Sequence, residues 1–374
     1  MAISHHILLY PSFDLARFPC AHPITKMSTN KSKNGGTAVK SLVVERPGSL
    51  TIEKRPLPKP SPGEVCIRVE RAGICGSDVH ILHGSNPFAR YPRVIGHEFF
   101  GRIDAIGDGV AARIGARVVV NPVIGCGRCY PCSVGRPNVC AQLQVLGVHR
   151  DGGFCEFVCV PIGNVHLLPD SINDDQAPLV EPFSVAANIT DHTQVFASDI
   201  ALVYGAGPIG LTVVQVLKNV YGVRELIVTD RIDARLEAAR ANGAERVINT
   251  ARTALPAELA TSGTQPTLLI DAACHPSILG EAIEIASPAA RIGIMGFSGD
   301  PSTIIQQKIT SKELAIHSSR LNCGKFAKVI DWFATGKLHP ERLITHRYGI
   351  DNYATAFHTF EHNQTECCKV QLTF

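Results

Sequence analysis

Short runs of alternating apolar and polar residues fill the first part of the chain. Between residues 40 and 70 the runs SLVVE, TIEK and EVCIRVE are separated by the turn PGS and a proline-rich connector. Period-two alternation of this kind predicts half-buried strands. Residues 99–106, 117–121 and 153–160 are further strand candidates, with Gly, Pro and Asp between them. The pattern therefore predicts a small, mostly β domain.

From about residue 185 the pattern changes to buried apolar runs that alternate with helical segments. ALVYGAG predicts a strand entering a glycine turn, and PIGLTVVQVLKNVYG predicts a helix that ends at Gly222. ELIVTD predicts a second strand, residues 234–243 the next helix, and LLIDAAC and RIGIMGF two more strands. Repeated strand–helix units of this kind predict a doubly wound parallel sheet, and the chain as a whole is expected to be α/β.

The end of the chain predicts a helix near residues 326–336 and a last strand, KVQLTF. We place this strand back on the β domain, which makes the doubly wound domain an insertion. The expected organisation is an N-terminal tail of residues 1–37, a β domain of residues 38–186 plus 320–374, and a nucleotide domain of residues 187–319. The tail shows no clear periodicity, and Met27 is an alternative start of the protein.

Composition and charge exclude several classes of protein. The 374 residues are 45% hydrophobic and 18% charged, which is typical of a globular chain with two domains of ordinary size. A net charge of +3, from 36 basic and 33 acidic residues, argues against a nucleic-acid partner. Apolar runs such as residues 200–204 fall short of the roughly 20 residues that cross a membrane, and residues 7–10 are too short for a secretory signal. No membrane association is expected.

Four of the thirteen cysteines lie close together in CGRCYPCSVGRPNVC, as Cys126, Cys129, Cys132 and Cys140. Four thiolates in one loop fit a closed tetrahedral Zn²⁺ site that stabilises the fold. An iron–sulfur cluster is the alternative that this spacing leaves open. A metal site accounts for these thiols better than disulfides do, so we expect a reducing cytoplasm.

A glycine-rich turn, G-x-G-x-x-G, stands between a predicted strand and a predicted helix. Its glycines, Gly205, Gly207 and Gly210, allow close approach of a pyrophosphate to the helix N-terminus. Asp230 ends the next strand, where a carboxylate accepts hydrogen bonds from ribose hydroxyls and repels a 2′-phosphate, which favours NAD over NADP. Arg231 beside it complicates this preference, because an arginine here could accommodate a 2′-phosphate, although such a residue more often lies at the surface or against the adenine. The structural alternative is a tight strand-to-helix connection that binds no ligand. The other predicted cofactor-binding residues are Pro208, Ile209 and Arg235.

A second metal site is predicted from Cys75 in GICGSDVH and from His97 and Glu98 in GHE. A thiolate, an imidazole and a carboxylate are suitable ligands for a catalytic Zn²⁺ that keeps one position open. Glu181, in VEPFSV, is a further acidic candidate. Taken singly, each of these residues also fits an ordinary structural role, as a buried thiol, a core histidine, a surface charge or a carboxylate at a helix N-terminus.

Oxidation of an alcohol also requires removal of its hydroxyl proton while a hydride leaves for the nicotinamide. Zn²⁺ lowers the pKa of a bound alcohol. Ser77 is placed to take the proton, and His80 to pass it to solvent through the cofactor ribose. Spacing alone assigns neither role.

Together these motifs resemble the zinc-containing medium-chain dehydrogenase/reductase family over residues 37–374. The resemblance implies a GroES-like β domain that carries the metals, an inserted Rossmann domain that binds NAD, and an active site between them. It matches Cys75 and His97 to zinc ligands, Ser77 and His80 to proton-relay positions, and the cysteine loop to a structural zinc site. Glu181 falls where the polyol-dehydrogenase branch has Glu, so that it either ligates zinc or exchanges with Glu98.

Within the family, YPRVIGHEF, LGVHRDGGF and LITHRY resemble sorbitol, idonate and galactonate 5-dehydrogenases. The resemblance implies a sugar acid or polyol substrate, above all an aldonate such as L-gulonate, L-galactonate or L-idonate oxidised at C5. A carboxylate substrate needs a cation, for which Arg320 is the first candidate and His149 and Arg93 are weaker ones. Cys274 stands where many relatives carry Gly.

Two other classes of function compete with a zinc dehydrogenase. An NAD-binding regulatory or starvation-sensing protein could use the same fold, and only the presence of Ser77, His80 and the metal ligands favours catalysis over it. A zinc-free reductase is disfavoured because Cys75, His97 and Glu98 are all present. A homodimer or homotetramer is expected.

Overall fold

The computed structural model describes residues 38–374, so the predicted tail and the alternative start at Met27 lie outside the described residues. Within residues 38–374, no helix is both long and apolar enough to span a membrane.

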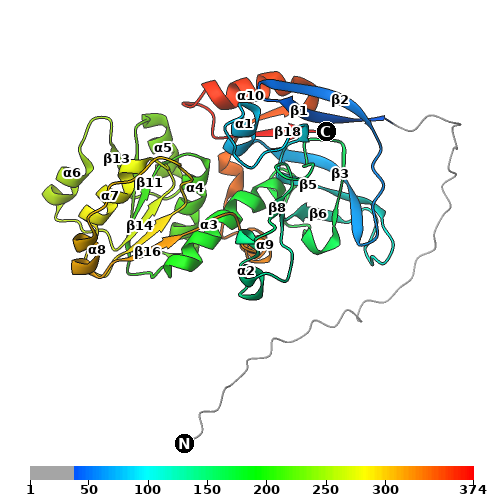
Figure 1. The fold of residues 1–374 in the computed structure, drawn as a ribbon. Helices are drawn as coiled ribbons and strands as arrows, with labels where there is room; N and C mark the ends of the chain where they lie inside the picture. The colour runs from blue at the N-terminus through cyan, green and yellow to red at the C-terminus, as the bar shows by residue number, and fades with distance from the viewer. Residues whose placement is uncertain (1–37) are drawn as a thin grey trace, which may run out of the picture. The chain divides into compact units, whose positions relative to one another are not determined.

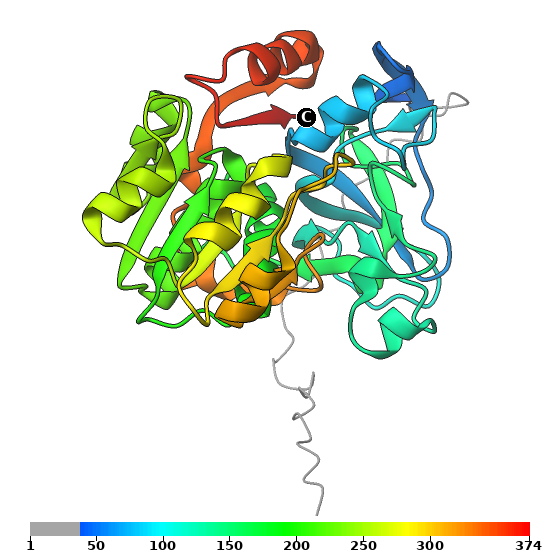
Figure 2. The same ribbon diagram turned by 60° about the vertical axis from the view of Figure 1, so that its left-hand side comes forward.

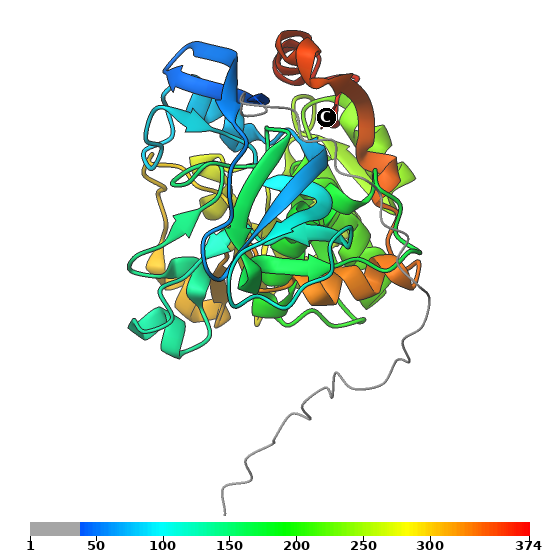
Figure 3. The same ribbon diagram turned by 90° about the vertical axis from the view of Figure 1, so that its right-hand side faces the viewer.

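Antiparallel strands dominate the first domain, which Figure 3 shows from the side of its blue-to-green strands. The main sheet contains β3 (Glu64–Gly73), β5 (Glu98–Ile106), β6 (Arg117–Val120), β9 (Phe157–Pro161), β10 (Val165–Leu167), β17 (Ile344–Gly349) and β18 (Lys369–Thr373). Its order is β10-β6-β5-β3-β18-β17, with β9 also paired to β3. Smaller sheets join β1 (Ala38–Arg46), β2 (Ser49–Pro56) and β4 (Arg93–Val94), and β7 (Val123–Ile124) and β8 (Gln144–Val145).

The last strand returns to this domain, as predicted. Red strand β18 runs antiparallel to blue β3, with Gln371 opposite Gly73, and parallel to β17 (Figure 1). Along β3, Val65, Ile67 and Val69 are buried while Arg68 is exposed, as the sequence alternation predicted. Cys66 is buried as well, so the alternation is interrupted at that position. The helices of this part are α1 (Gly76–Leu82), α2 (Tyr130–Ser133) and α10 (Tyr353–His362). The short 3₁₀ helices are η1 (Pro137–Val139), η2 (Ile162–Asn164), η3 (Ala177–Leu179), η5 (Pro340–Leu343) and η6 (Ile350–Asn352).

The predicted strand at residues 153–160 begins later, at Phe157. Gly152, Gly153 and Phe154 instead donate backbone hydrogen bonds of 2.8–3.0 Å to the carbonyls of residues 94–96. These bonds fasten residues 152–154 to the loop that precedes His97. The three residues therefore belong to a loop and not to strand β9.

The second domain is a parallel sheet with helices on both faces (Figure 2), which confirms the predicted doubly wound fold. Its strands, in spatial order, are β13 (Arg246–Asn249), β12 (Glu225–Asp230), β11 (Ile200–Tyr204), β14 (Leu268–Asp271), β15 (Arg291–Ile294) and β16 (Ala315–Ser318). Along β11, Ala201 and Val203 face one core and Leu202 and Tyr204 face the other. The strand order reverses between β11 and β14, where ligands bind in sheets of this kind.

The helices of this part are α3 (Val180–Thr193), α4 (Pro208–Gln215), α5 (Asp233–Ala241), α6 (Leu255–Ser262), α7 (Pro276–Ile285), α8 (Gln306–Lys312) and α9 (Phe326–Ala334). The helix predicted from Pro208 to Gly222 is divided, because α4 continues as a π-helical segment, η4 (Val216–Tyr221), before Gly222 ends it at φ 61°. The wider segment keeps Val216 and Leu217 in the core.

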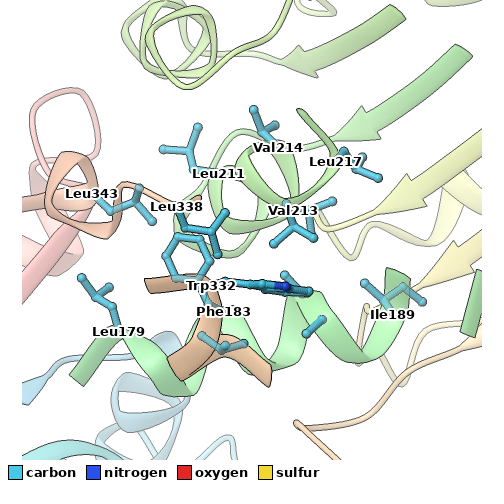
Figure 4. Close-up of a cluster of buried hydrophobic side chains, with 14 of the residues drawn as sticks. Leu179, Phe183, Ile189, Leu211, Val213, Val214, Leu217, Trp332, Leu338 and Leu343 are labelled. Atoms are coloured by element: carbon cyan, nitrogen blue, oxygen red, sulfur yellow. The ribbon is translucent and has the colours of Figure 1, made fainter. Parts of the chain in front are cut away.

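One hydrophobic core contains α3, α4 and α9 (Figure 4). Phe183 of α3 packs edge-on against Phe333 of α9, with ring centroids 5.1 Å apart. The predicted boundary at residue 187 falls inside α3, and α9, which the sequence placed with the β domain, shares this core. The three helices share one core because their apolar faces pack together, although α9 is far from α3 and α4 in the sequence.

Candidate active site

A buried group of three possible metal ligands lies where two neighbouring strands end. Cys75 follows β3, and Glu98 begins β5 opposite Gly73 of β3, with His97 just before it. The register of this strand pair brings a Cys75 sulfur, a His97 nitrogen and a Glu98 oxygen within 4.8 Å of one another. A side chain at Gly73 would meet Glu98 Oε2 at 2.3 Å, so only glycine leaves room for the carboxylate.

The loop before His97 depends on a second glycine. Gly96 has φ 91°, and a Cβ there would lie 2.2 Å from the ring of Phe154. Its close packing, together with the backbone bonds from residues 152–154, directs His97 toward Cys75.

Asp78 is a site residue that the sequence analysis did not single out. It is fully buried, and its carboxylate accepts hydrogen bonds from the backbone N–H of Cys75 (2.9 Å) and of Gly96 (3.1 Å). The same carboxylate lies 3.5 Å from His97 Nδ1. A carboxylate behind a ligand histidine fixes the ring and raises its basicity. Its place three residues after Cys75, as in a capping box, was the signal available in the sequence.

Lys369 is the second residue that was missed. Its Nζ lies 2.6 Å from Glu98 Oε1 and 2.5 Å from Oε2, and it donates to the Ile74 carbonyl at 3.1 Å. Burial lowers the pKa of Lys369, but Glu98 and Cys75 raise it to about 12, so the lysine is charged. Glu98 is therefore neutralised by a lysine that only the fold brings to it.

Glu181 lies in the first turn of α3, 5% exposed, beside but outside the group of three. Burial raises its pKa to about 7; His97, Lys369 and Asn322 oppose this effect, and Glu98 adds to it. A buried carboxylate of this kind is stabilised by a nearby cation. Thiolate, imidazole and carboxylate donors are those that Zn²⁺ accepts, so the residues present fit this metal.

The two predicted proton-transfer residues lie on α1. Ser77 Oγ is 3.3 Å from His97 Nε2, which places Ser77 at the metal group. His80 contacts Ser85 Oγ through Nδ1 at 2.9 Å. His80 also lines a cavity of about 370 Å³ together with Gly76, Pro208 and Arg235. The structure thus brings α1 and the N-terminus of α4 to one cavity.

The geometry of the glycine-rich turn requires glycine at two of its three positions, 205 and 210, while a Cβ at Gly207 would meet open space. Gly205 has φ 91°, and a Cβ at Gly210 would lie 1.9 Å from the Gly205 carbonyl oxygen. Gly207 caps α4, which begins with Pro208 and Ile209, so the N-terminus of this helix is open to a phosphate.

Asp230 supports the turn from the neighbouring strand. Its carboxylate accepts hydrogen bonds from the backbone N–H of Ala206 (2.8 Å), Arg231 (2.7 Å) and Ile232 (3.0 Å). Arg235 donates to the Gln364 carbonyl at 3.3 Å, which holds its guanidinium at the cavity.

The four cysteines of the loop form a second compact group. Cys129 Sγ lies 3.5 Å from Cys132 Sγ and 3.6 Å from Cys140 Sγ. Sulfurs bound tetrahedrally to one Zn²⁺ at about 2.3 Å stand about 3.8 Å apart. In a [4Fe–4S] cluster each thiolate binds a different iron, and in a [2Fe–2S] cluster only two thiolates share one iron, so four sulfurs do not all lie close together. Here all four lie within 4.8 Å of one another, which favours a single metal ion.

Backbone amides prepare this group for a cation. Hydrogen bonds from the N–H groups of Ala141 and Cys132 lower the pKa of Cys129 to about 6. Amides of Arg128 and Cys129 also lower the pKa of Cys126. Burial and the neighbouring Cys129 instead raise the pKa of Cys132 to about 11. The backbone amides therefore favour the thiolate, which is the metal-binding form, at Cys126 and Cys129 only.

The three candidates for substrate binding differ in their neighbours: Arg320 and His149 lie beside aromatic rings, whereas Arg93 forms an ion pair. The Arg320 guanidinium lies over the rings of Phe88 (5.0 Å) and Phe297 (5.7 Å). The ring of His149 is 6.3 Å from that of Phe88. Arg93 instead pairs with Asp151 at 2.8 Å.

The electrostatics of these candidates also differ. Burial, followed by the charges of Arg320, Arg90 and Arg93, lowers the pKa of His149, which favours its neutral form. No carboxylate among residues 38–374 pairs with Arg320. Of the three candidates, Arg320 is therefore the one whose positive charge no carboxylate among the described residues neutralises.

Comparisons with known proteins agree with this arrangement. The model for the alcohol dehydrogenase GroES-like domain matches residues 61–170, and that for zinc-binding dehydrogenase matches residues 208–335. The starvation-sensing protein RspB of Escherichia coli K12 is 58% identical over 337 residues, which cover 90% of this chain and 99% of RspB. L-galactonate-5-dehydrogenase of the same strain is 31% identical, covering 89% of this chain and 98% of that protein.

A solved structure is similar over the same range. The short chain alcohol dehydrogenase rspB of Escherichia coli CFT073, complexed with NADH, superimposes with a TM-score of 0.89 at 57% identity. The similarity covers 91% of this chain and 100% of that one.

Proposed function

Because this chain belongs to the zinc-type medium-chain alcohol dehydrogenase family, we propose that it is a zinc- and NAD-dependent dehydrogenase of a sugar acid or polyol. Its substrate in this proposal is an aldonate, such as L-gulonate, L-galactonate or L-idonate, oxidised at C5. The observation that carries the proposal is the group of Cys75, His97 and Glu98. Cys75 immediately precedes α1, and α1 lines a cavity together with Pro208, which follows the second glycine of the glycine-rich turn.

Residues of the chain supply the remaining parts of the reaction. Zn²⁺ held by Cys75 and His97, with Glu98 or Glu181, would lower the pKa of an alcohol hydroxyl. In this proposal Ser77, next to His97, accepts the hydroxyl proton, and His80 passes it on along the cavity. Asp78 holds the His97 ring during this transfer.

NAD is supported over NADP by the carboxylate of Asp230 at the end of β12, which would repel a 2′-phosphate. The NADH in the solved structure of the 57% identical relative agrees with this preference. Arg235 at the cavity is then a further contact of the proposed cofactor site.

The test is NADH formation by metal-loaded protein with a panel of aldonates, polyols and simple alcohols, and a parallel series with NADP⁺. Turnover of one or two aldonates with NAD⁺ would support the proposal and name the substrate. The name of the 58% identical relative favours one other candidate, an NAD-binding sensor. Binding of zinc and NAD⁺ without turnover of any substrate would favour that sensor.

Arg320 is expected to select the substrate carboxylate. Changing Arg320→Gln should raise KM for an aldonate about tenfold or more, since a hydrogen bond to a charged group contributes about 1.5–3 kcal/mol. KM for neutral sorbitol should stay the same, because sorbitol has no carboxylate.

The matched control is Arg93→Gln, which should have a smaller effect because Asp151 already neutralises Arg93. Steady-state kinetics of both variants with both substrates measures the difference. An equal rise in KM for aldonate and sorbitol would show that Arg320 only packs against Phe88 and Phe297.

Assembly and location extend the proposal. Strand β16 is the edge of the parallel sheet and exposes Ile316 by 37%, while Ile304 and Ile305 nearby in sequence are about half exposed. An open, apolar sheet edge supports a homodimer or homotetramer, which light scattering would measure. The cysteines among residues 38–374 are free thiols, which supports a cytoplasmic location, testable by cell fractionation.

A further inference from the structure

Two cysteines that neither predicted metal site uses face each other across neighbouring strands. Cys66 of β3 is paired directly with Cys159 of β9 in their antiparallel register. The residues on either side of the two cysteines lie in one hydrophobic core; they are Val65, Ile67, Val158 and Val160. Because successive side chains of a strand point to opposite faces, both cysteines point away from that core, to the same face of the sheet.

The backbone hydrogen bonds of this strand pair determine how close the two cysteines come. The N–H groups of Val69 and Ile162 donate across the pair to carbonyls of the other segment, at 2.9 and 3.0 Å. Hydrogen-bonded pairs alternate with non-hydrogen-bonded pairs along an antiparallel ladder, so Cys66 and Cys159 form a non-hydrogen-bonded pair. The Cα atoms of such a pair are about 4.5 Å apart, which lies within the roughly 4.4–6.8 Å that a disulfide spans.

The two thiols differ in access to solvent. Cys66 is 1% exposed, whereas Cys159 is partly exposed and lines a cavity of about 400 Å³, separate from the cavity that His80 and Arg235 line. The thiols hydrogen-bond each other, and this contact raises the pKa of Cys66 and lowers the pKa of Cys159. The more reactive sulfur is therefore the accessible one, and a second thiol is in contact with it.

Cys155 lines the same cavity but is not placed to be the partner of Cys159. Its Sγ donates to the carbonyls of Phe157 at 3.1 Å and of Gly152 at 3.3 Å. The residue paired with Cys155 across the adjoining strand is Ser41, which has no sulfur. Cys66 is thus the thiol that the strand register brings to Cys159.

We propose that Cys66 and Cys159 form a site of reversible oxidation, at which hydrogen peroxide produces a disulfide that joins β3 to β9. The Cys159 sulfur attacks one peroxide oxygen, the O–O bond breaks, and a sulfenic acid forms while the other oxygen leaves as water. The Cys66 sulfur then attacks the Cys159 sulfur, the S–O bond breaks, and a second water leaves. The two thiols together lose two electrons and two protons, which reduce one peroxide to two waters.

The test is treatment of zinc-loaded protein with equimolar hydrogen peroxide, followed by digestion without reductant and mass spectrometry. The wild type should lose two free thiols per chain and yield the peptide of Cys66 linked to the peptide of Cys159. Dithiothreitol should restore both thiols, because it reverses a disulfide by exchange. The zinc content should stay the same, since neither cysteine belongs to the two groups that fit zinc.

Variants of each cysteine separate the two steps. Cys66→Ala, checked for folding by circular dichroism, should give no linked peptide, and dimedone should instead trap the sulfenic acid on Cys159. Cys159→Ser should give neither product. Cys274→Ser, which removes an exposed thiol elsewhere, should form the same linked peptide as the wild type.

Absence of the linked peptide from the oxidised wild type, or linkage of Cys159 to any other cysteine, overturns the proposal. Formation of a dimedone adduct on Cys159 in the wild type as readily as in Cys66→Ala would also overturn it, because Cys66 would then not trap the sulfenic acid. These measurements require no turnover, so their outcome is independent of the proposed dehydrogenase reaction.

Discussion

Replacement of Cys75 by alanine is expected to abolish turnover while the fold and NAD binding persist. The thiolate is one of three donors in the buried group, and its loss leaves His97 and Glu98 alone. A catalytic metal supplies several kcal/mol, and each roughly 1.4 kcal/mol is a factor of ten in rate, so kcat should fall about a thousandfold or more.

The fold should survive because the local structure depends on backbone atoms at this position. Asp78 accepts its hydrogen bond from the Cys75 N–H, which alanine retains. Circular dichroism, NADH fluorescence titration and zinc content check the variant beside its kinetics. The expected zinc content is one ion lower than that of the wild type.

Cys159→Ala is the matched control, since it removes a thiol from β9 away from the group of three. Turnover by the Cys159 variant should be close to that of the wild type. Loss of folding by Cys75→Ala would assign Cys75 a structural role, and retained turnover would remove it from the catalytic site.

Cys129→Ser is expected to have the opposite effect, a large loss of stability. Its sulfur lies 3.5–3.6 Å from two of the other loop thiols, and serine removes a ligand from a closed site. Loss of a structural metal belongs to the few changes that cost about 4 kcal/mol or more. The thermal midpoint should fall, and one zinc ion per chain should be lost.

Cys323→Ser provides the control for this loop. The Cys323 thiol lies 3.5 Å from the Gly135 carbonyl of the same lobe but outside the group of four. Thermal unfolding and zinc analysis of both variants measure the difference. Equal stability of the two variants would mean that the four cysteines hold no stabilising ion.

Local sequence patterns were sufficient for much of the site. The cysteine loop, the glycine-rich turn and the pair His97 and Glu98 each lie within a short segment, where spacing and backbone chemistry determine what the residues can do. Alternation along β3 and the apolar runs of β11 and β12 also determined the two kinds of sheet. The predicted return of the last strand was confirmed because KVQLTF needed a partner for its backbone groups.

Only the tertiary structure decided which residues far apart in the sequence meet. Lys369 neutralises Glu98 across 271 positions, and His83 meets Glu361 across 278. The Arg320 guanidinium lies over the rings of Phe88 and Phe297, while Asp151 neutralises Arg93. These contacts follow from the register of strands and from which helices share a core. Periodicity determines the face on which a residue lies, but the partner on that face is chosen by packing of the whole chain.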